Sequence, residues 1–370
     1  MTQLLHPLLL LVVAAIGTLA TTPLAKQASV RLGALDHPGG RRVHKDLTPR
    51  LGGVALFFGL ILALTTEIIG ESLLGWQGIF NVSSISTESA EHMVSYIGVL
   101  IGLCVILAVG FIDDIQHISA KLKLLGQIIA ASIIVSSGVV FTELQLPFST
   151  WVLYLGPTNI TWLPDGILGY PLSVLYLVSF ANIINLIDGI DGLATTVAGI
   201  AAIALLVMSA LTQQPATVLL AVLAIGVCLG FLPVNLPQAK IFLGDSGALF
   251  LGMLLGTLSL FVVMRAPSIK LVTVVLVVVA IPILDTLLAI VRRMRARRPV
   301  FSADAEHLHH RMIARFSNKM SLAIVALWML ALSACGVLMF LSPGPVALAL
   351  LAIAMAASIA AFGWLGMLKR

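Results

Sequence analysis

Charge is what this 370-residue sequence has least of: 10% of its residues are Asp, Glu, Lys or Arg, whereas 59% are hydrophobic. Ordinary soluble domains are about one quarter charged, so a soluble fold of this length could not bury so much apolar surface. The mean hydropathy of +1.10 is typical of a chain embedded in lipid. The uncharged runs also lack the polar and apolar alternation of barrel strands, which leaves helices as the spanning elements.

Cysteine is scarce too. Cys104, Cys228 and Cys335 lie far apart within apolar runs, and no two of them have C-x-x-C spacing. We interpret them as core thiols, which argues against a disulfide framework or a cysteine metal site. The first seven residues contain no Lys or Arg. This argues against a cleaved signal peptide, so the first apolar run is expected to remain as a span.

Eleven apolar runs are predicted to cross the membrane, and several approach the roughly 20 residues that a helix needs to span a bilayer. We therefore expect an all-α integral membrane protein of about eleven transmembrane helices, forming a single polytopic domain over residues 1–370. The runs cover residues 4–25, 52–70, 93–112, 122–141, 171–188, 193–211, 216–233, 246–264, 270–291, 320–340 and 346–366.

The Lys and Arg residues predict the orientation of these helices. With the N-terminus in the periplasm and the C-terminus in the cytoplasm, all of the 21 basic residues except Arg265 and Lys270 lie on the cytoplasmic side. Such a bias is the usual topological signal of membrane proteins. Carboxylates, amides and histidines gather on the same side, which topology does not explain. We therefore expect cytoplasmic loops 26–51, 112–123, 234–245 and 292–319 to form one active face.

A polar stretch interrupts the apolar pattern in the middle of the chain. Asn182, Asn185, Asp188 and Asp191 recur every three residues, so a continuous helix would place them on one face. Two glycines in the same stretch, 182–192, are expected to end the helix and to let its backbone approach a ligand. Polar packing between helices is the alternative for Asn182 alone. Ionisable groups at membrane depth indicate a functional site.

Three further carboxylates lie at predicted helix ends. Asp113 and Asp114 are adjacent at the end of the third span, where they repel each other and oppose the helix dipole. This placement favours a cation or a shared proton over a pair that only faces water. Asp245 begins the eighth span, and at that position helix capping and metal ligation are equally good interpretations.

Basic loops accompany the carboxylates. Arg41, Arg42 and His44 precede a glycine pair at the start of the second span, and arginine suits phosphate through its paired donors. A loop that only sets topology explains this segment equally well. Lys121 and Lys123 follow the paired aspartates.

The last cytoplasmic loop contains three clustered histidines, His307, His309 and His310, followed by Arg311. No Cys or carboxylate set completes a zinc site there, and the arginines would repel a cation. A basic loop with histidines is better suited to a diphosphate. Elsewhere, Asp and Asn oxygens select Mg²⁺, with Mn²⁺ as the alternative. Together these features predict phosphoryl-group chemistry on a lipid substrate.

Short motifs in a fixed order resemble those of the polyprenyl-phosphate N-acetylhexosamine-1-phosphate transferases, and in particular the bacterial undecaprenyl-phosphate GlcNAc-1-phosphate transferases. Each motif is modest alone, but together they span most of the chain. They are Asp36-x-Pro38-x-x-Arg41-Arg42-x-His44, Pro49-Arg50-x-Gly52-Gly53, Asp113-Asp114, Asn185-x-x-Asp188-x-x-Asp191-Gly192, Phe242-x-Gly244-Asp245-Ser246-Gly247, Ile281-Pro282-x-x-Asp285, and Pro299-x-Phe301-Ser302 before His307-x-His309-His310.

The resemblance implies a reaction in the bacterial cytoplasmic (inner) membrane, with the active site on its cytoplasmic face. A phosphate oxygen of undecaprenyl phosphate would attack the sugar-bearing phosphorus of a UDP-N-acetylhexosamine and release UMP, which starts a lipid-linked cell-envelope glycan. The expected cofactor is Mg²⁺, or Mn²⁺ in its place. The expected partners are the two substrates, membrane lipid and a second copy of the chain in a homodimer, with no nucleic acid.

The resemblance also implies roles for individual residues. Asn185 and Asp245 would hold the metal. Asp113, Asp114 and Asp188 would be catalytic: Asp113 and Asp114 at the reacting phosphates, one of them orienting or deprotonating the lipid phosphate, and Asp188 beside Asp191 near the nucleotide. The other residues form two groups: Asp191, His307, His309, His310 and Arg311 for the nucleotide, diphosphate and sugar, and Arg41, Arg42, His44, Lys121 and Lys123 for the lipid phosphate.

Several other protein classes share parts of this pattern. The pentapeptide-sugar branch of the same family also has paired aspartates and a histidine-rich loop, but the motif from Asp36 to His44 fits the amino-sugar branch better. A membrane prenyltransferase would need Asp at position 117, which is His117. A CDP-alcohol phosphotransferase would need Ala and Arg where Thr195 and Thr196 stand. A transporter would carry its polar groups near the bilayer midplane, not at one face.

Overall fold

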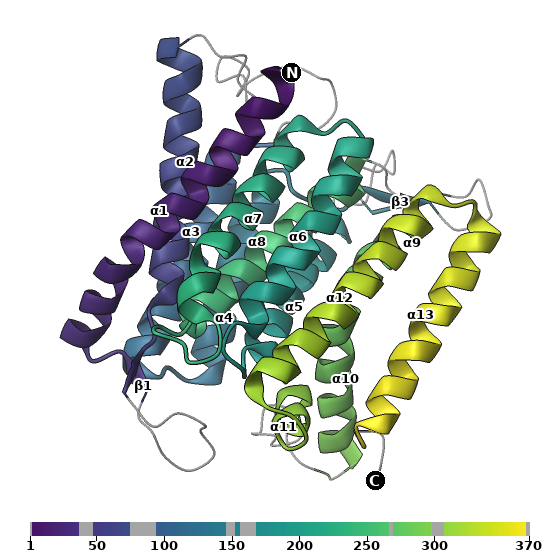
Figure 1. Ribbon diagram of the computed structural model, residues 1–370. Helices are drawn as coiled ribbons and strands as arrows, with labels where there is room; N and C mark the ends of the chain where they lie inside the picture. Colours follow the sequence, from purple (N-terminus) through teal and green to yellow (C-terminus); the bar gives the residue numbers. More distant parts are fainter. Residues whose placement is uncertain are drawn as a thin grey trace.

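The structure is a computed structural model that describes residues 2–36, 47–74, 94–145, 152–155, 168–265, 269–295, 297 and 307–367. Helices dominate it (Figure 1). They are α1 (Thr2–Leu32), α2 (Gly52–Leu74), α3 (Tyr96–Gln116), α4 (Ala120–Ser136), α5 (Gly169–Ile187), α6 (Leu193–Leu211), α7 (Pro215–Asn235), α8 (Gly244–Arg265), α9 (Ile269–Val278), α10 (Ala280–Arg295), α11 (Leu308–Ile313), α12 (Asn318–Leu341) and α13 (Gly344–Trp364).

Nine of the helices in the described ranges are long and apolar enough to cross a membrane: α1, α2, α3, α5, α6, α7, α8, α12 and α13. The pair α9 and α10 makes a tenth span if it is counted as one, although its halves meet at 84°. Helix α4 has only 17 residues. The expected class, an all-α integral membrane protein, is confirmed. The expected count of eleven corresponds to these ten together with α4, and it stays a prediction.

The bend between α9 and α10 has a cause in the sequence. Pro282 lies in the first turn of α10. Proline has no N–H to donate and its ring clashes with the preceding turn, so a straight helix cannot continue through it. The bend leaves α10 as a separate helix beside α5, which it contacts. The ninth predicted span was expected to be one continuous run, so this geometry was not foreseen.

Helix α8 forms the centre of the bundle and is almost completely buried. It packs against α2, α3, α5, α6 and α7. Glycines allow these close contacts: a Cβ on Gly252 would lie 2.6 Å from Ala181 Cα of α5, and a Cβ on Gly110 of α3 would lie 2.5 Å from Ser246 Cα. The second contact brings the C-terminal end of α3 to the first turn of α8.

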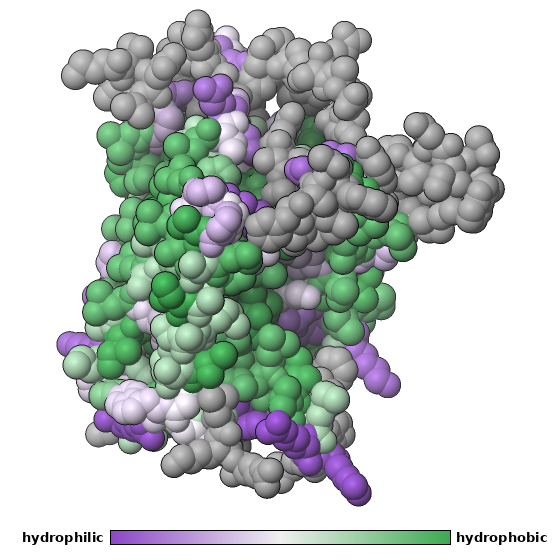
Figure 2. Space-filling view, turned by 90° about the vertical axis from the view of Figure 1, so that its right-hand side faces the viewer, coloured by the Kyte–Doolittle hydropathy of each residue, from purple (hydrophilic) through white to green (hydrophobic). Residues whose placement is uncertain are grey.

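The outer surface is apolar. Figure 2 shows a green apolar band between two ends where hydrophilic residues gather. Leu327 on α12 and Ile353 on α13 are 66% and 64% exposed. Large exposed apolar side chains of this kind, in helices of spanning length, are expected to face lipid.

Two short antiparallel strand pairs complete the described structure, and neither was predicted. Strand β1 (Leu35–Asp36) pairs with β2 (Thr48–Pro49), and β3 (Glu143–Gln145) pairs with β4 (Val152–Tyr154). The first pair lies at the same end of the bundle as α11, and the second lies toward the other end (Figure 1). Phe242, two residues before α8, donates its N–H to Pro49 O of β2 at 2.8 Å. Since β1 is paired with β2, this bond brings both Asp36 and Arg50 toward the start of α8.

The helix break predicted in the polar stretch 182–192 is confirmed. Helix α5 ends at Ile187, and α6 begins after Gly192, whose φ of 77° is in the left-handed region that glycine tolerates. Asn182 forms two hydrogen bonds with Gln127 of α4, at 2.6 and 3.2 Å. Helix packing, the alternative interpretation for Asn182, is therefore what the structure shows.

Candidate active site

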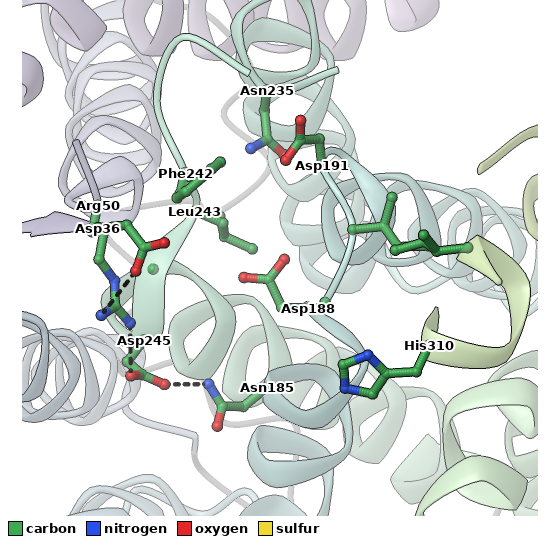
Figure 3. A pocket seen from close by; sticks show the side chains of 14 residues that line it. Asp36, Arg50, Asn185, Asp188, Asp191, Asn235, Phe242, Leu243, Asp245 and His310 are labelled. Carbon is green, nitrogen blue, oxygen red and sulfur yellow. Dashed lines mark hydrogen bonds and ion pairs between the residues drawn. The ribbon is translucent and has the colours of Figure 1, made fainter. Parts of the chain in front are cut away.

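A cavity of about 400 Å³ opens at the end of the bundle where α5 ends and α8 begins. Four carboxylates and one arginine lie on its wall, so charged groups are concentrated there (Figure 3). The lining residues are Asp36, Arg50, Asn185, Asp188, Gly189, Ile190, Asp191, Asn235, Phe242, Leu243, Gly244, Asp245, His310 and Ile313. They come from β1, the segment before α2, the end of α5 and the α5–α6 connection, the end of α7, the α7–α8 connection with the start of α8, and α11.

Asn185 and Asp245, the two residues predicted to hold a metal ion, are in contact. Asn185 Nδ2, in the last turn of α5, donates to Asp245 Oδ1, in the first turn of α8, at 2.5 Å. Across the described ranges, no group of three or more His, Cys, Asp or Glu side chains is placed to hold a metal. Two oxygen-bearing residues nevertheless fit Mg²⁺, which commonly takes one or two protein ligands and completes its shell with phosphate and water.

Lys123 links this pair to Asp113. Its Nζ donates to Asp245 Oδ1 at 2.7 Å and to Asp113 Oδ2 at 2.9 Å. The chain reverses between α3 and α4 at His117, whose φ of 50° is left-handed and whose N–H donates to Asp113 O. This turn places α4 so that Lys123 faces the end of α3. Asp113 is not on the cavity wall, and it reaches the candidate metal pair through Lys123.

Asp114 holds the start of α8. Its Oδ1 accepts the Asp245 N–H at 2.8 Å, and its Oδ2 accepts the Ser246 N–H at 3.0 Å. The side chain is fully buried. A carboxylate at this place satisfies free N–H groups of the first helical turn and matches the helix dipole. Asp114 therefore positions Asp245. The structure does not place it on the cavity wall, and its expected contact with a reacting phosphate stays a prediction.

Arg50 belongs to the motif Pro49-Arg50-x-Gly52-Gly53, but it was not predicted as a site residue. Its Nη2 lies 3.6 Å from both Asp114 Oδ1 and Asp245 Oδ2, and its Nη1 lies 3.9 Å from Asp36 Oδ1. One guanidinium thus faces three carboxylates, of which Asp36 and Asp245 lie on the cavity wall with it (Figure 3). A signal was present in the sequence, since Arg50 stands two residues before a span that begins with two glycines.

Asp188 follows the last residue of α5 and lies on the cavity wall between Asp245 and Asp191 (Figure 3). Burial, and then the negative charge of Asp245, raise the pKa of the Asp188 carboxyl to about 8. Asp191 has a different environment. Its Oδ2 accepts the N–H groups of Gln238 and Ala239, each at 3.1 Å. Asp191 thereby fastens the start of α6 to the α7–α8 connection.

Asn235, at the end of α7, was not predicted as a site residue. Its Oδ1 accepts the Thr195 hydroxyl at 3.0 Å, and its Nδ2 donates to Ile241 O at 3.1 Å. These bonds hold the segment that carries Phe242 against the cavity. An amide in the last turn of an apolar helix is the same signal that identified Asn185, but Asn235 stands alone in the sequence.

The rings of His307, His309 and His310 lie against one another beside the cavity, and we call them the histidine stack. The His307 and His309 rings are nearly parallel with centroids 5.8 Å apart, and the His309 and His310 centroids are 4.1 Å apart. Only His310 lies on the cavity wall. The His309 ring covers Gly189, where an added Cβ would lie 2.4 Å from the ring carbons. Burial, and then the neighbouring histidines, lower the pKa of His309 to about 4, so it is uncharged at neutral pH.

Asp285 of α10 holds the histidine stack, and sequence reasoning missed this role. Its Oδ2 lies 3.0 Å from His307 Nδ1, and its Oδ1 accepts the Leu308 N–H at 2.8 Å. Both side chains are buried. A carboxylate within a predicted span is a signal for a functional role, and Asp285 carried that signal.

The other predicted basic residues are placed less centrally. Lys121 is exposed and Arg311 is half-buried, and neither lies on the cavity wall. Arg41, Arg42 and His44 lie outside the described residues. Of the basic groups predicted to bind the lipid phosphate, Lys123 is the one that the structure brings to the candidate metal pair.

Comparisons with known proteins identify the family of this chain. Residues 96–263 match the model of glycosyl transferase family 4. A Bacillus subtilis protein described as a probable undecaprenyl-phosphate N-acetylglucosaminyl 1-phosphate transferase is 32% identical over 85% of this chain and 80% of its own length. This chain belongs to that transferase family. The resemblance drawn from the short motifs is therefore confirmed.

Other relatives of this transferase family show similar coverage. A Mycobacterium tuberculosis decaprenyl-phosphate N-acetylglucosaminephosphotransferase is 35% identical over 86% of this chain and 78% of its own length. A Yersinia pestis undecaprenyl-phosphate alpha-N-acetylglucosaminyl 1-phosphate transferase is 26% identical over 85% and 79%. The matched family region runs from α3 to α8 and includes Asp113, Asn185 and Asp245, whereas Arg50 and the histidine stack lie outside it.

Proposed function

We propose that this chain transfers N-acetylglucosamine-1-phosphate, or a related N-acetylhexosamine-1-phosphate, from a UDP-sugar to undecaprenyl phosphate and releases UMP. Relatives at 32% and 35% identity carry names of this activity with undecaprenyl or decaprenyl phosphate. The observation that carries the proposal is the contact of Asn185 and Lys123 with Asp245, together with the bond from Lys123 to Asp113. It joins hard-cation oxygens to a basic group at the end of a membrane bundle, as transfer between two phosphates requires.

Asn185 and Asp245 are proposed to hold Mg²⁺, or Mn²⁺ in its place. Carboxylate and amide oxygens suit these ions, and the cavity leaves room for the phosphates that would complete the shell. The ion would neutralise charge on the transferred phosphate. Asp114 has a supporting role in this proposal, because its bonds to the first turn of α8 fix the direction of Asp245.

Asp188 is proposed to orient or deprotonate the lipid phosphate. Of the three carboxylates that were expected to be catalytic, it is the one on the cavity wall. A general base acts best when its pKa lies near the working pH, and the pKa of Asp188 is raised to about 8. Asp113 has an indirect role in the proposed reaction, because it holds Lys123 near Asp245.

The opposite end of the cavity is proposed to receive the nucleoside. Asp191 and Asn235 lie there, with Phe242 between them and Asp245 (Figure 3). An aromatic ring offers a surface on which a base can stack. This arrangement directs the diphosphate of a UDP-sugar toward Asn185 and Asp245, with His310 on the adjacent wall.

We further propose that the cavity faces the bacterial cytoplasm, with the N-terminus of the chain in the periplasm. The end of the bundle that carries the cavity also carries Arg50 and Lys123, and the basic last turn of α10 precedes the loop to the histidine stack. The positive-inside bias supports a cytoplasmic position for this end. The cavity groups gather at helix ends, which favours a transferase over a transporter with a midplane site.

Purified protein supplied with undecaprenyl phosphate and a panel of UDP-sugars tests the reaction. UMP should appear with UDP-GlcNAc or a related UDP-N-acetylhexosamine, and a chelator should stop its release until Mg²⁺ is restored. Omitting the lipid phosphate is the control and should give no UMP. If no sugar supports metal-dependent UMP release, the proposed function is wrong. A transporter would move its substrate without forming UMP.

Replacing Gly189 with Ala should impair the reaction without unfolding the protein. The added Cβ would lie 2.4 Å from the His309 ring, so the histidine stack must move away from the cavity. Small displacements of groups that position a substrate reduce turnover strongly, so we expect UMP release to fall about tenfold or more. Gly199→Ala is the matched control, because its Cβ would meet Cys228 at an ordinary 3.4 Å. Equal activity of the two variants would contradict a role for the stack.

A further inference from the structure

Asp245 is engaged by cations of the chain itself. Lys123 Nζ lies 2.7 Å from Asp245 Oδ1, and Arg50 Nη2 lies 3.6 Å from Asp245 Oδ2. Asn185 Nδ2 also donates to Oδ1. Both carboxylate oxygens of the proposed metal ligand are therefore already in contact with a positively charged side chain.

The two cations do not hold Asp245 equally. Among the described residues, Lys123 forms short bonds to two carboxylates, Asp245 and Asp113. Arg50 faces Asp36, Asp114 and Asp245 at 3.6 to 3.9 Å, so its charge is shared and its contact with Asp245 is loose. Of the two cations, Lys123 is thus the one that is hydrogen-bonded to Oδ1, the oxygen that also accepts from Asn185.

A divalent ion on Asp245 would stand against the Lys123 ammonium. Like charges a few ångströms apart repel strongly where water is scarce, and the Lys123 side chain is only 17% exposed. The ion and Lys123 therefore cannot share Oδ1 without cost. Lysine has a flexible stem with a compact charge at its tip, so it can change partners while Asp113 keeps it in the site.

We propose that Lys123 competes with the divalent ion for Asp245 and moves to a substrate phosphate when the ion binds. This inference rests on the proposed function. The phosphate that arrives with the ion is the nearest anion able to replace Asp245 as the partner of Lys123. The site then disfavours a bare metal ion and favours a metal ion that comes together with a diphosphate.

Direct measurement of Mn²⁺ binding tests the competition. Electron paramagnetic resonance would count free Mn²⁺ over purified protein in detergent, without substrate. Lys123→Gln should bind Mn²⁺ at least tenfold more tightly than the wild-type chain, which corresponds to about 1.4 kcal/mol. Lys121→Gln removes the same charge from an exposed position two residues earlier on α4 and should stay within twofold of wild type. Mn²⁺ binding by Lys123→Gln that is equal to wild type, or weaker, would overturn the proposal.

A second measurement tests the movement of Lys123. With saturating Mn²⁺, UDP should bind Lys123→Gln at least tenfold more weakly than wild type, and unchanged UDP affinity would overturn this step. If Lys123→Gln does not fold, Lys123→Met in its place keeps the apolar stem of the side chain and must show the same tighter Mn²⁺ binding. Lys123→Arg, which keeps the charge, should bind Mn²⁺ no more tightly than wild type.

The proposed transferase reaction and the proposed competition at Asp245 can be contradicted separately. A wild-type chain that neither binds Mn²⁺ nor releases UMP would contradict the proposed function. A wild-type chain that releases UMP with Mn²⁺, while its Lys123→Gln variant binds Mn²⁺ no more tightly, would contradict only the competition. Thermal unfolding of each variant in detergent separates both outcomes from loss of the fold.

Discussion

Asp245→Asn is expected to reduce UMP release by at least about 10²- to 10³-fold while leaving the protein folded. The substitution keeps the size of the side chain but removes the charge that Lys123 and Arg50 both face. It also removes the carboxylate proposed to bind the ion. Initial rates of UMP release, with Mg²⁺ varied over a wide range, measure the effect.

Glu143→Gln provides the control for Asp245→Asn. Glu143 belongs to the β3–β4 pair, away from the cavity, and its substitution also removes one negative charge. It should leave UMP release within about twofold of wild type, because Glu143 is partly buried in a strand pair that does not line the cavity. Retained turnover in Asp245→Asn would remove Asp245 as the metal ligand and would leave the contact with Asn185 a structural one.

Asp114→Asn is expected to lower both stability and activity, and this combination identifies a positioning residue. Each Asp114 oxygen accepts one N–H from the first turn of α8. An amide can accept only one of these bonds and presents an NH₂ group to the other N–H. Leaving a buried donor unsatisfied costs about 1–3 kcal/mol. We therefore expect a lower unfolding temperature, weaker Mn²⁺ binding and UMP release reduced by about 10²-fold.

The measurements on Asp114→Asn separate its two candidate roles. A positioning role predicts that Mn²⁺ affinity falls together with the unfolding temperature, because Asp245 loses its fixed direction. A direct role at a reacting phosphate predicts lost turnover with both of those quantities unchanged. The second result would support the original expectation from the sequence.

Much of the architecture was predictable because it depends on local pattern. The spans follow from apolar runs, and the break after α5 follows from the glycines and polar groups of segment 182–192. The proximity of Asn185 to Asp245 was also predictable, since both lie at span ends on the same side of the topology. What these predictions share is that each needs only hydropathy, spacing and orientation.

The assignment of roles within the site was less predictable because it depends on which helices touch. Asp113 and Asp114 are neighbours in sequence, yet Asp113 faces Lys123 while Asp114 faces the backbone of α8. That difference follows from the close approach of Gly110 to Ser246, which no single segment reveals. Asp191 likewise was predicted to bind the nucleotide from its place in the polar stretch 182–192, but its Oδ2 accepts two backbone N–H groups.

The contact of Asp285 also depends on how helices pack, and its partner is distant in sequence. Its partner His307 is 22 residues away, and the two meet because α10 bends away from α9 at 84°. The proline that favours the bend is visible in the sequence, but the direction of the bend depends on packing against α5. The sequence therefore shows that a carboxylate in that span is unusual, but it does not show that its partner is His307.

The burial of α8 should make the position of Asp245 insensitive to the thickness of the bilayer. A spanning helix that touches lipid must match its apolar length to the bilayer, and it tilts when the thickness changes. Helix α8 is surrounded by α2, α3, α5, α6 and α7, so its height and tilt are set by those neighbours. Membranes of different thickness should therefore reorient the outer helices before they shift Asp245.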